Sequence, residues 1–101
     1  MQDYQIAGVA RDVAHANVTI NAVLPGMFDT DRIKSNFARA AAQQSVSEDQ
    51  IKTQRMNSIP AKRLGTAEEF GRIAAFLSSA HAGYITGQNI LIDGGLFPGA
   101  F

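Results

Sequence analysis

The chain has 101 residues and no cysteine, which excludes a disulfide framework and thiolate chemistry. Its two histidines, His15 and His81, stand far apart in the sequence and lack partners at the spacing of metal ligands. We therefore expect both at the surface and assign no metal ligand.

The sequence also lacks an excess of charge of one sign and a long apolar run. Nine basic and nine acidic residues give a formal net charge of zero, so nothing predicts binding to nucleic acid or to a membrane surface. No apolar stretch approaches the roughly 20 residues that cross a bilayer, and no signal peptide is recognisable. A cytoplasmic location is the default expectation.

What is present is typical of a small α/β unit. The apolar content of 46% is near the globular average and is sufficient for a core. A nearly continuous apolar run over 18–23 predicts a buried parallel strand, and a second strand is expected over 88–93. A helix is predicted over 2–15, because an apolar stripe recurs there at Ile6, Val9, Ala10 and Val13.

Three further helices are expected between the two strands. Ser47 with Gln50 forms a capping-box pattern for a short helix over 48–56, and Thr66 with Glu69 forms a stronger one for a helix that runs to about residue 79. The buried stripe of this last helix is expected to be Phe70, Ile73, Ala74 and Leu77. A helix beginning at Asp31 places on one face Ile33, Phe37, Ala40 and Ala41.

Two charged residues each allow two interpretations. Arg63 either lies free at the surface or pins its loop by pairing with a carboxylate, and we favour the structural role. Asp93 is a carboxylate of the type used in catalysis, but no acid or base stands near it in the sequence, so a structural role is again favoured.

The most informative segment is Asn21-Ala-Val-Leu-Pro-Gly-Met-Phe-Asp-Thr30. Open α/β sheets bind ligands at the carboxyl ends of their strands, where this segment is expected to lie. Pro25 removes a backbone donor, Gly26 permits a sharp turn and the close approach of a ligand, and Thr30 offers a hydroxyl. By spacing alone, a binding site and an ordinary strand-to-loop connection both remain open.

Three further blocks follow in order: Arg63-x-Gly-Thr-x-Glu-Glu69, Tyr84-Ile-Thr-Gly-Gln88 and Asp93-Gly-Gly95. Together with the segment above, they resemble the C-terminal part of the short-chain dehydrogenase/reductase family, from about residue 4 to residue 97. The resemblance implies an α/β fold, the C-terminal part of a Rossmann-type doubly wound parallel sheet with two strands and about four helices. It also implies a single incomplete domain over 1–101.

The resemblance further implies a cofactor site for NAD or NADP. Pro25 and Gly26 would line the nicotinamide side, the Phe28 backbone would bind the carboxamide, and the Thr30 hydroxyl would bond the carboxamide or the pyrophosphate. The implied reaction is hydride transfer with a small-molecule carbonyl or secondary alcohol. Region 31–60 would correspond to the substrate-binding loop.

The sequence contains neither a Gly-rich dinucleotide turn nor the family's Tyr-x-x-x-Lys, since Tyr4 is followed four residues later by Gly8. We therefore assign no catalytic residue, and we expect this chain alone to be a fragment that neither turns over nor binds dinucleotide tightly. The alternative is a truncated, non-catalytic relative that acts as an oligomerisation module. The apolar helix stripe and the tail 96–101 predict a homo-oligomer.

Overall fold

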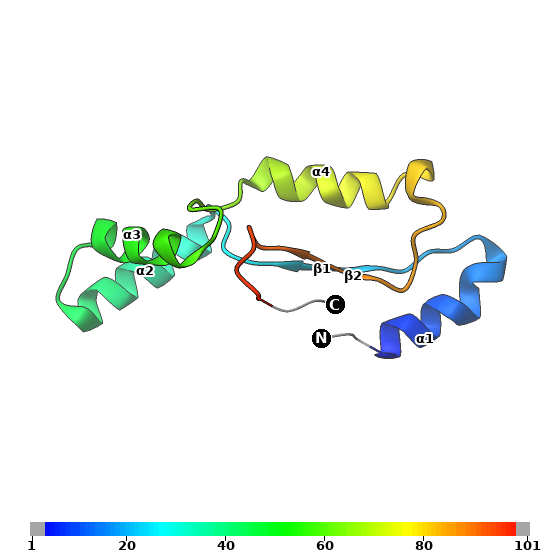
Figure 1. Cartoon of the computed structure of the whole chain (residues 1–101), viewed down its shortest axis with the longest axis horizontal. Helices are drawn as coiled ribbons and strands as arrows, with labels where there is room; N and C mark the ends of the chain where they lie inside the picture. Colours follow the sequence, from blue (N-terminus) through cyan, green and yellow to red (C-terminus); the bar gives the residue numbers. More distant parts are fainter. Residues whose placement is uncertain (1–3, 99–101) are drawn as a thin grey trace.

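The computed structural model describes residues 4–98, which form two strands and four helices (Figure 1). In chain order the elements are α1 (Tyr4–Val13), a 3-10 turn (Ala14–Ala16), β1 (Ala22–Pro25), α2 (Asp31–Gln44), α3 (Glu48–Ser58), α4 (Ala67–Leu77), a second 3-10 turn (Ala80–Ala82) and β2 (Asn89–Ile92).

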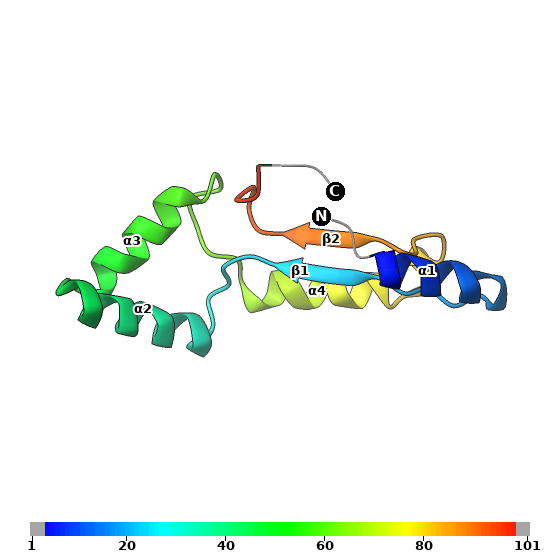
Figure 2. The same ribbon diagram turned by 90° about the horizontal axis from the view of Figure 1, so that it is seen from below.

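The two strands form a parallel sheet in which Ala22 lies opposite Asn89 and Pro25 lies opposite Ile92. Helix α4 lies over one face of this sheet, and α1 lies on the other side, toward the start of the strands (Figures 1 and 2). A parallel pair connected through helices, with helices on both sides, is the α/β arrangement that the sequence predicted.

The first strand begins later than the predicted 18–23, because its ladder with β2 starts only at Ala22. The preceding residues bond instead to the loop before β2. The Gly87 amide donates to the Ile20 carbonyl at 2.8 Å. The Asn21 side chain donates to the Ile85 carbonyl at 3.1 Å and accepts from the Gln88 amide at 3.0 Å. The apolar pattern was therefore right about an extended segment and wrong about its bounds.

Helix starts follow the predicted capping patterns. Ser47 and Thr66 each accept from the amide three residues on, and the side chains of Gln50 and Glu69 each bond back to the cap amide. The two capping boxes are thereby confirmed. Helix α3 extends two residues beyond the expected end, and α4 ends two residues before it.

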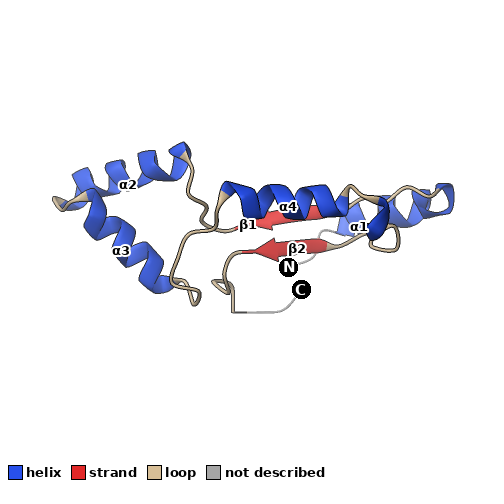
Figure 3. Cartoon of the chain, turned by 90° about the horizontal axis from the view of Figure 1, so that it is seen from above, coloured by secondary structure: helices blue, strands red, loops and turns tan. Residues whose placement is uncertain are grey.

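The hydrophobic core lies in the helical hairpin formed by α2 and α3. Ile51 and Ile59 are the largest fully buried side chains, with exposed fractions of 0% and 1%. The hairpin lies beyond the carboxyl ends of the strands (Figure 3). The residues buried together in its core cluster are Phe37, Ala41, Ile51, Ile59 and Leu64.

Helix α4 buries much less than its apolar stripe predicted. None of its residues is buried, and the exposed fraction of Phe70 is 36%. The prediction of a buried stripe is wrong because the sheet beneath α4 is only two strands wide in the described residues, so the helix overhangs it.

The molecule is elongated, with extents of 55 × 24 × 21 Å and a radius of gyration of 16.9 Å. A compact domain of this length has a radius of gyration of about 13 Å. The accessible surface of 7182 Å² likewise exceeds the roughly 5,500 Å² expected for a compact monomer of this mass. Within residues 4–98, no helix is long and apolar enough to cross a membrane.

Candidate functional site

The four predicted cofactor-binding residues gather at one hollow of about 570 Å³ at the carboxyl end of β1. Open parallel sheets bind ligands in this position. The structure therefore brings together residues that the sequence singled out only by a strand-to-loop pattern and a resemblance. The hollow is lined by Pro25, Gly26, Phe28, Thr30, Arg32, Ile33, Asn36, Ala67 and Phe70.

Gly26 is required by the way the two strands end side by side. Its amide donates to the Ile92 carbonyl at 3.0 Å, continuing the ladder beyond Pro25. A Cβ atom added at Gly26 would lie 2.6 Å from the Cβ and 2.8 Å from the Cα of Asp93. Glycine at this position therefore allows the two strand ends to pack closely, and it also leaves the hollow open.

Phe28 forms an isolated parallel bridge with Gly65. The Gly65 amide donates to the Met27 carbonyl at 2.9 Å, and the Asp29 amide donates to the Gly65 carbonyl at 2.8 Å. In this parallel bridge the hydrogen bonds are made by the two chain neighbours of Phe28, Met27 and Asp29. The N–H and C=O of Phe28 itself therefore point away from Gly65. Neither group has a hydrogen-bond partner in the described part of the chain.

Thr30 is the N-cap of α2, a role that the sequence interpretation missed. Its hydroxyl oxygen accepts from the Ile33 amide at 3.3 Å. A threonine directly before an acidic first turn and an apolar stripe is the signal that could have revealed it. The hydroxyl proton is not used by this cap, so Thr30 still offers a donor at the rim of the hollow.

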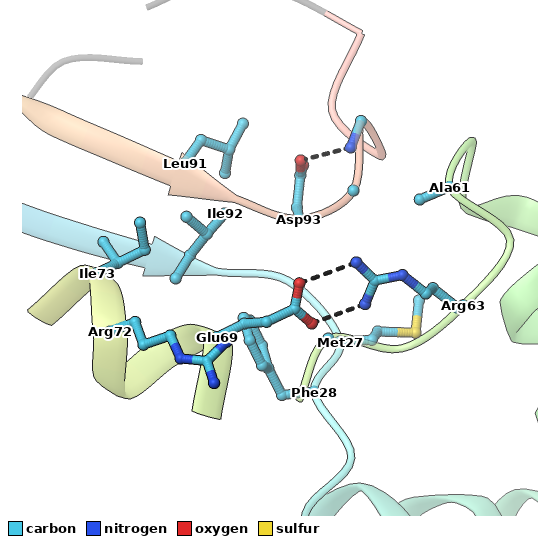
Figure 4. A pocket seen from close by; sticks show the side chains of 13 residues that line it. Met27, Phe28, Ala61, Arg63, Glu69, Arg72, Ile73, Leu91, Ile92 and Asp93 are labelled. Carbon is cyan, nitrogen blue, oxygen red and sulfur yellow. Dashed lines mark hydrogen bonds and ion pairs between the residues drawn. The ribbon is translucent and has the colours of Figure 1, made fainter. Parts of the chain in front are cut away.

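A second hollow of about 490 Å³ also borders Phe28 and lies between the end of β2, the loop before α4 and α4 itself (Figure 4). Arg63 and Glu69 point toward each other across its floor and form a two-pronged ion pair, with N–O distances of 2.7 and 2.9 Å. The open question about Arg63 is therefore answered in favour of pairing.

The Glu69 carboxylate accepts a third hydrogen bond, because its Oε1 also accepts from the Thr66 amide at 2.9 Å. The hydrogen bonds from Arg63 and then from the Thr66 backbone lower the pKa of Glu69 to about 2. The hydrogen bond to Glu69 raises the pKa of Arg63 in turn. Both residues are thus ionised over the whole neutral range.

Asp93 has the structural role that the sequence favoured. Its carboxylate accepts from the Gly95 amide at 3.0 Å and from the Phe97 amide at 2.8 Å, which ties the turn after β2. Both histidines lie exposed, as expected. Across residues 4–98, no three acidic or histidine side chains gather closely enough to hold a metal ion.

A parallel pair of strands joined through helices, with a hollow at the carboxyl ends of the strands, is the arrangement in which open α/β proteins bind ligands. Comparison with known families agrees. Residues 6–97 match the family model described as enoyl-(acyl carrier protein) reductase, and the chain belongs to the short-chain dehydrogenase/reductase family.

Individual relatives are similar over most of this chain. The NADPH-dependent reductase BacG of Bacillus subtilis is 40% identical over 87 residues, which is 86% of this chain and 34% of that protein. The 3-oxoacyl-[acyl-carrier-protein] reductase FabG of Chlamydia pneumoniae is 36% identical over 88 residues, 87% of this chain and 31% of the relative.

A solved structure shows the same arrangement in three dimensions. A short-chain dehydrogenase family protein from Francisella tularensis superposes with a TM-score of 0.87 at 29% identity, covering 92% of this chain and 38% of that one. The predicted fold class is thus confirmed. The chain spans about a third of the length of the curated relatives that it matches.

Proposed function

We propose that the chain forms the nicotinamide-side wall of an NAD(P)-dependent short-chain oxidoreductase. The observation that carries the proposal is the unpaired N–H and C=O of Phe28 beside the hollow at the end of β1. A primary carboxamide presents one acceptor and one donor side by side, which complements this pair of backbone groups.

Each of the other wall residues has a distinct part in this proposal. Pro25 and Gly26 leave room for the flat ring, because neither projects a polar or flexible side chain into the hollow. Thr30 donates its hydroxyl to the carboxamide or to the pyrophosphate. The cofactor, NAD or NADP, supplies hydride exchange with a small-molecule carbonyl or secondary alcohol, and these residues of the chain bind and orient it.

The α2–α3 hairpin, which spans most of region 31–60, would cover the substrate. It stands at the carboxyl ends of the strands, next to the proposed ring position (Figure 1). Its own core cluster keeps it folded as a unit while its outer face remains available to a substrate. The acyl-carrier-protein and reductase names of the relatives are consistent with a carbonyl substrate.

Titration of the 101-residue chain with NADH and with NADPH, followed by amide chemical shifts, tests the proposal. We expect shifts concentrated in 26–30, at an affinity weaker than about 10 μM, which corresponds to roughly −7 kcal/mol. The weakness follows from the absence of a Gly-rich turn for the phosphates. Unperturbed amides over 26–30 at millimolar cofactor would contradict the assigned wall, and a tighter dissociation constant would show that this chain also holds the phosphates.

A second candidate function, an oligomerisation module, is favoured by the apolar side chains that the sheet region exposes. Val9, Val18 and Phe76 retain 51%, 45% and 46% of their surface. Phe97, in the predicted tail, retains 45%, whereas Phe101 lies outside the described residues. We propose that this surface is covered by a second copy of the chain.

A further inference from the structure

The Phe28 segment is held by the loop before α4 and not by the sheet. Pro25 is the last residue of β1, and beyond Gly26 the backbone leaves the ladder. Between Gly26 and Thr30, the main-chain hydrogen bonds of the segment go to Gly65, at 2.8 and 2.9 Å. The orientation of the Phe28 N–H and C=O is therefore set by the position of Gly65.

The aromatic ring of Phe28 adds a second contact to the same loop. A Cβ atom added at Gly65 would lie 2.6 Å from one ring carbon of Phe28 and 2.7 Å from another, so the ring rests directly on the glycine backbone. The ring edge also meets Phe70 of α4, with centroids 5.7 Å apart and planes at 87°. The positions of the Phe28 backbone and of its side chain thus both depend on the position of Gly65.

Gly65 is in turn fixed from both sides by one carboxylate. Glu69 binds the Arg63 guanidinium on one side of Gly65 and the Thr66 amide on the other. Arg63 also donates to the carbonyl of Leu64, the residue between it and Gly65, at 3.2 Å. The fork geometry of a guanidinium on a carboxylate fixes direction as well as distance.

We propose that Arg63 and Glu69 are positioning residues for the cofactor wall. Through Gly65 they orient the backbone groups of Phe28 that would bind the nicotinamide carboxamide, without touching the cofactor themselves. This inference rests on the proposed function for the identity of the ligand. The mechanical part, that the ion pair holds Phe28, stands on the contacts alone.

Amide hydrogen exchange on the 101-residue chain tests the mechanical part. The Asp29 amide bonds to Gly65, whereas the Gly26 amide bonds to Ile92 and serves as an internal reference. We expect Glu69→Gln to speed exchange at Asp29 by about threefold to fivefold, the range of an exposed ion pair, and to leave Gly26 unchanged. Arg63→Lys, which keeps the charge but not the fork, should do the same.

The matched control is Glu68→Gln. Glu68 is the neighbouring acid on α4, and it pairs at 3.4 Å with Arg72 instead of with the loop before α4; both side chains are more than three-quarters exposed. Exchange at Asp29 should be unaffected by this change. Two results for Glu69→Gln would overturn the inference. Equal acceleration at Asp29 and Gly26 would show that the chain is loosened generally, and no acceleration at either would show that Glu69 does not hold Phe28.

Titration of the same variants with NADPH, followed at the Phe28 amide, tests the link to the cofactor. We expect the dissociation constant to rise about threefold in Glu69→Gln and to stay unchanged in Glu68→Gln. An unchanged constant in Glu69→Gln would overturn the positioning role. If the parent chain shows no shift with NADH or NADPH, the proposed function fails and the cofactor role with it, while the exchange experiment separately decides whether Glu69 holds Phe28.

Discussion

The α2–α3 hairpin and the layer formed by α1, α4 and the two strands bury apolar side chains to different degrees. The hairpin and the loop that follows it enclose Phe37, Ile51, Ile59 and Leu64. In the described part of the layer, the buried apolar residues are Ala10 and Ala82, and no larger side chain is fully enclosed. A large apolar side chain stabilises a fold mainly when water is removed from it, so the hairpin carries its own stability and the layer does not.

The layer is held together mainly by hydrogen bonds and little by buried apolar side chains. The layer keeps backbone order through the β1–β2 ladder and the Asn21 side chain, which are hydrogen-bonded contacts of modest net value. Its apolar side chains face outward on α1, on α4 and at Val18. The site lies at the junction, with Phe28 between the hairpin and α4.

The largest expected effect is in the hairpin core. Ile51→Ala should destabilise the chain by about 2–5 kcal/mol, because Ile51 is fully enclosed and its loss leaves a cavity. Phe76→Ala on α4 should cost well under about 1.5 kcal/mol, because 46% of that side chain is already exposed. Urea denaturation of both variants measures the contrast. Equal losses would show that α4 buries Phe76 in solution as fully as the hairpin buries Ile51.

Two glycine substitutions separate the strand junction from the open face of α4. Gly26→Ala should cost about 1–3 kcal/mol, since the new methyl would lie 2.6 Å from Asp93. Gly71→Ala, at a position on α4 with no atom within 4 Å of the added carbon, should stabilise by about 0.5–1 kcal/mol. Thermal unfolding of the two variants measures both the expected loss and the expected gain of stability. A stable Gly26→Ala variant would mean that the strand ends are not packed as described.

The hairpin and the layer each contain one capping box, so the same substitution can be made in both regions. Ser47→Ala and Thr66→Ala each remove a side-chain acceptor from a helix start and should each cost about 1 kcal/mol. Helix content and unfolding midpoints of the two variants provide the measurement. A cost for Ser47→Ala without one for Thr66→Ala would show that α4 is not folded in the isolated chain.

The smallest expected effect is the pH dependence from Glu69. Its pKa is lowered from 4.5 to about 2 in the folded chain, so above about pH 5 the carboxylate is ionised in both states and its contribution is fully present. As the pH falls from 4.5 toward 2, the unfolded chain takes up the proton first and this contribution is lost. Denaturation midpoints of Glu69→Gln and its parent should therefore converge on acidification. A constant gap would contradict the assignment, and added salt should narrow the gap because the pair is exposed.

Local sequence rules predicted much of the fold because the signals lie within a few residues of each other. The cap and its partner stand three residues apart at Ser47 and at Thr66, and the stripe of Phe37 and Ala41 repeats within one helix. Strand bounds were less predictable. The register of β1 is set by residue 89, far along the chain, and the side chain of Asn21 replaces ladder bonds at its start.

The site was predictable only in part for the same reason. Residues 25–30 form one segment, so their common hollow follows from a single strand end. The bridge between Phe28 and Gly65 joins two loops that are distant in sequence and carry no shared pattern. From the sequence, Arg63 could be expected only to pair with some carboxylate. Its partner is Glu69 because the capping box turns the Glu69 side chain back toward the loop.

Light scattering on the purified 101-residue chain at tens of micromolar measures whether the layer associates with a second copy. Because the layer exposes apolar surface, we predict a dimer or larger species whose unfolding midpoint rises with protein concentration. A monodisperse monomer that unfolds cooperatively, with a midpoint independent of concentration, would show that a second copy does not cover this surface.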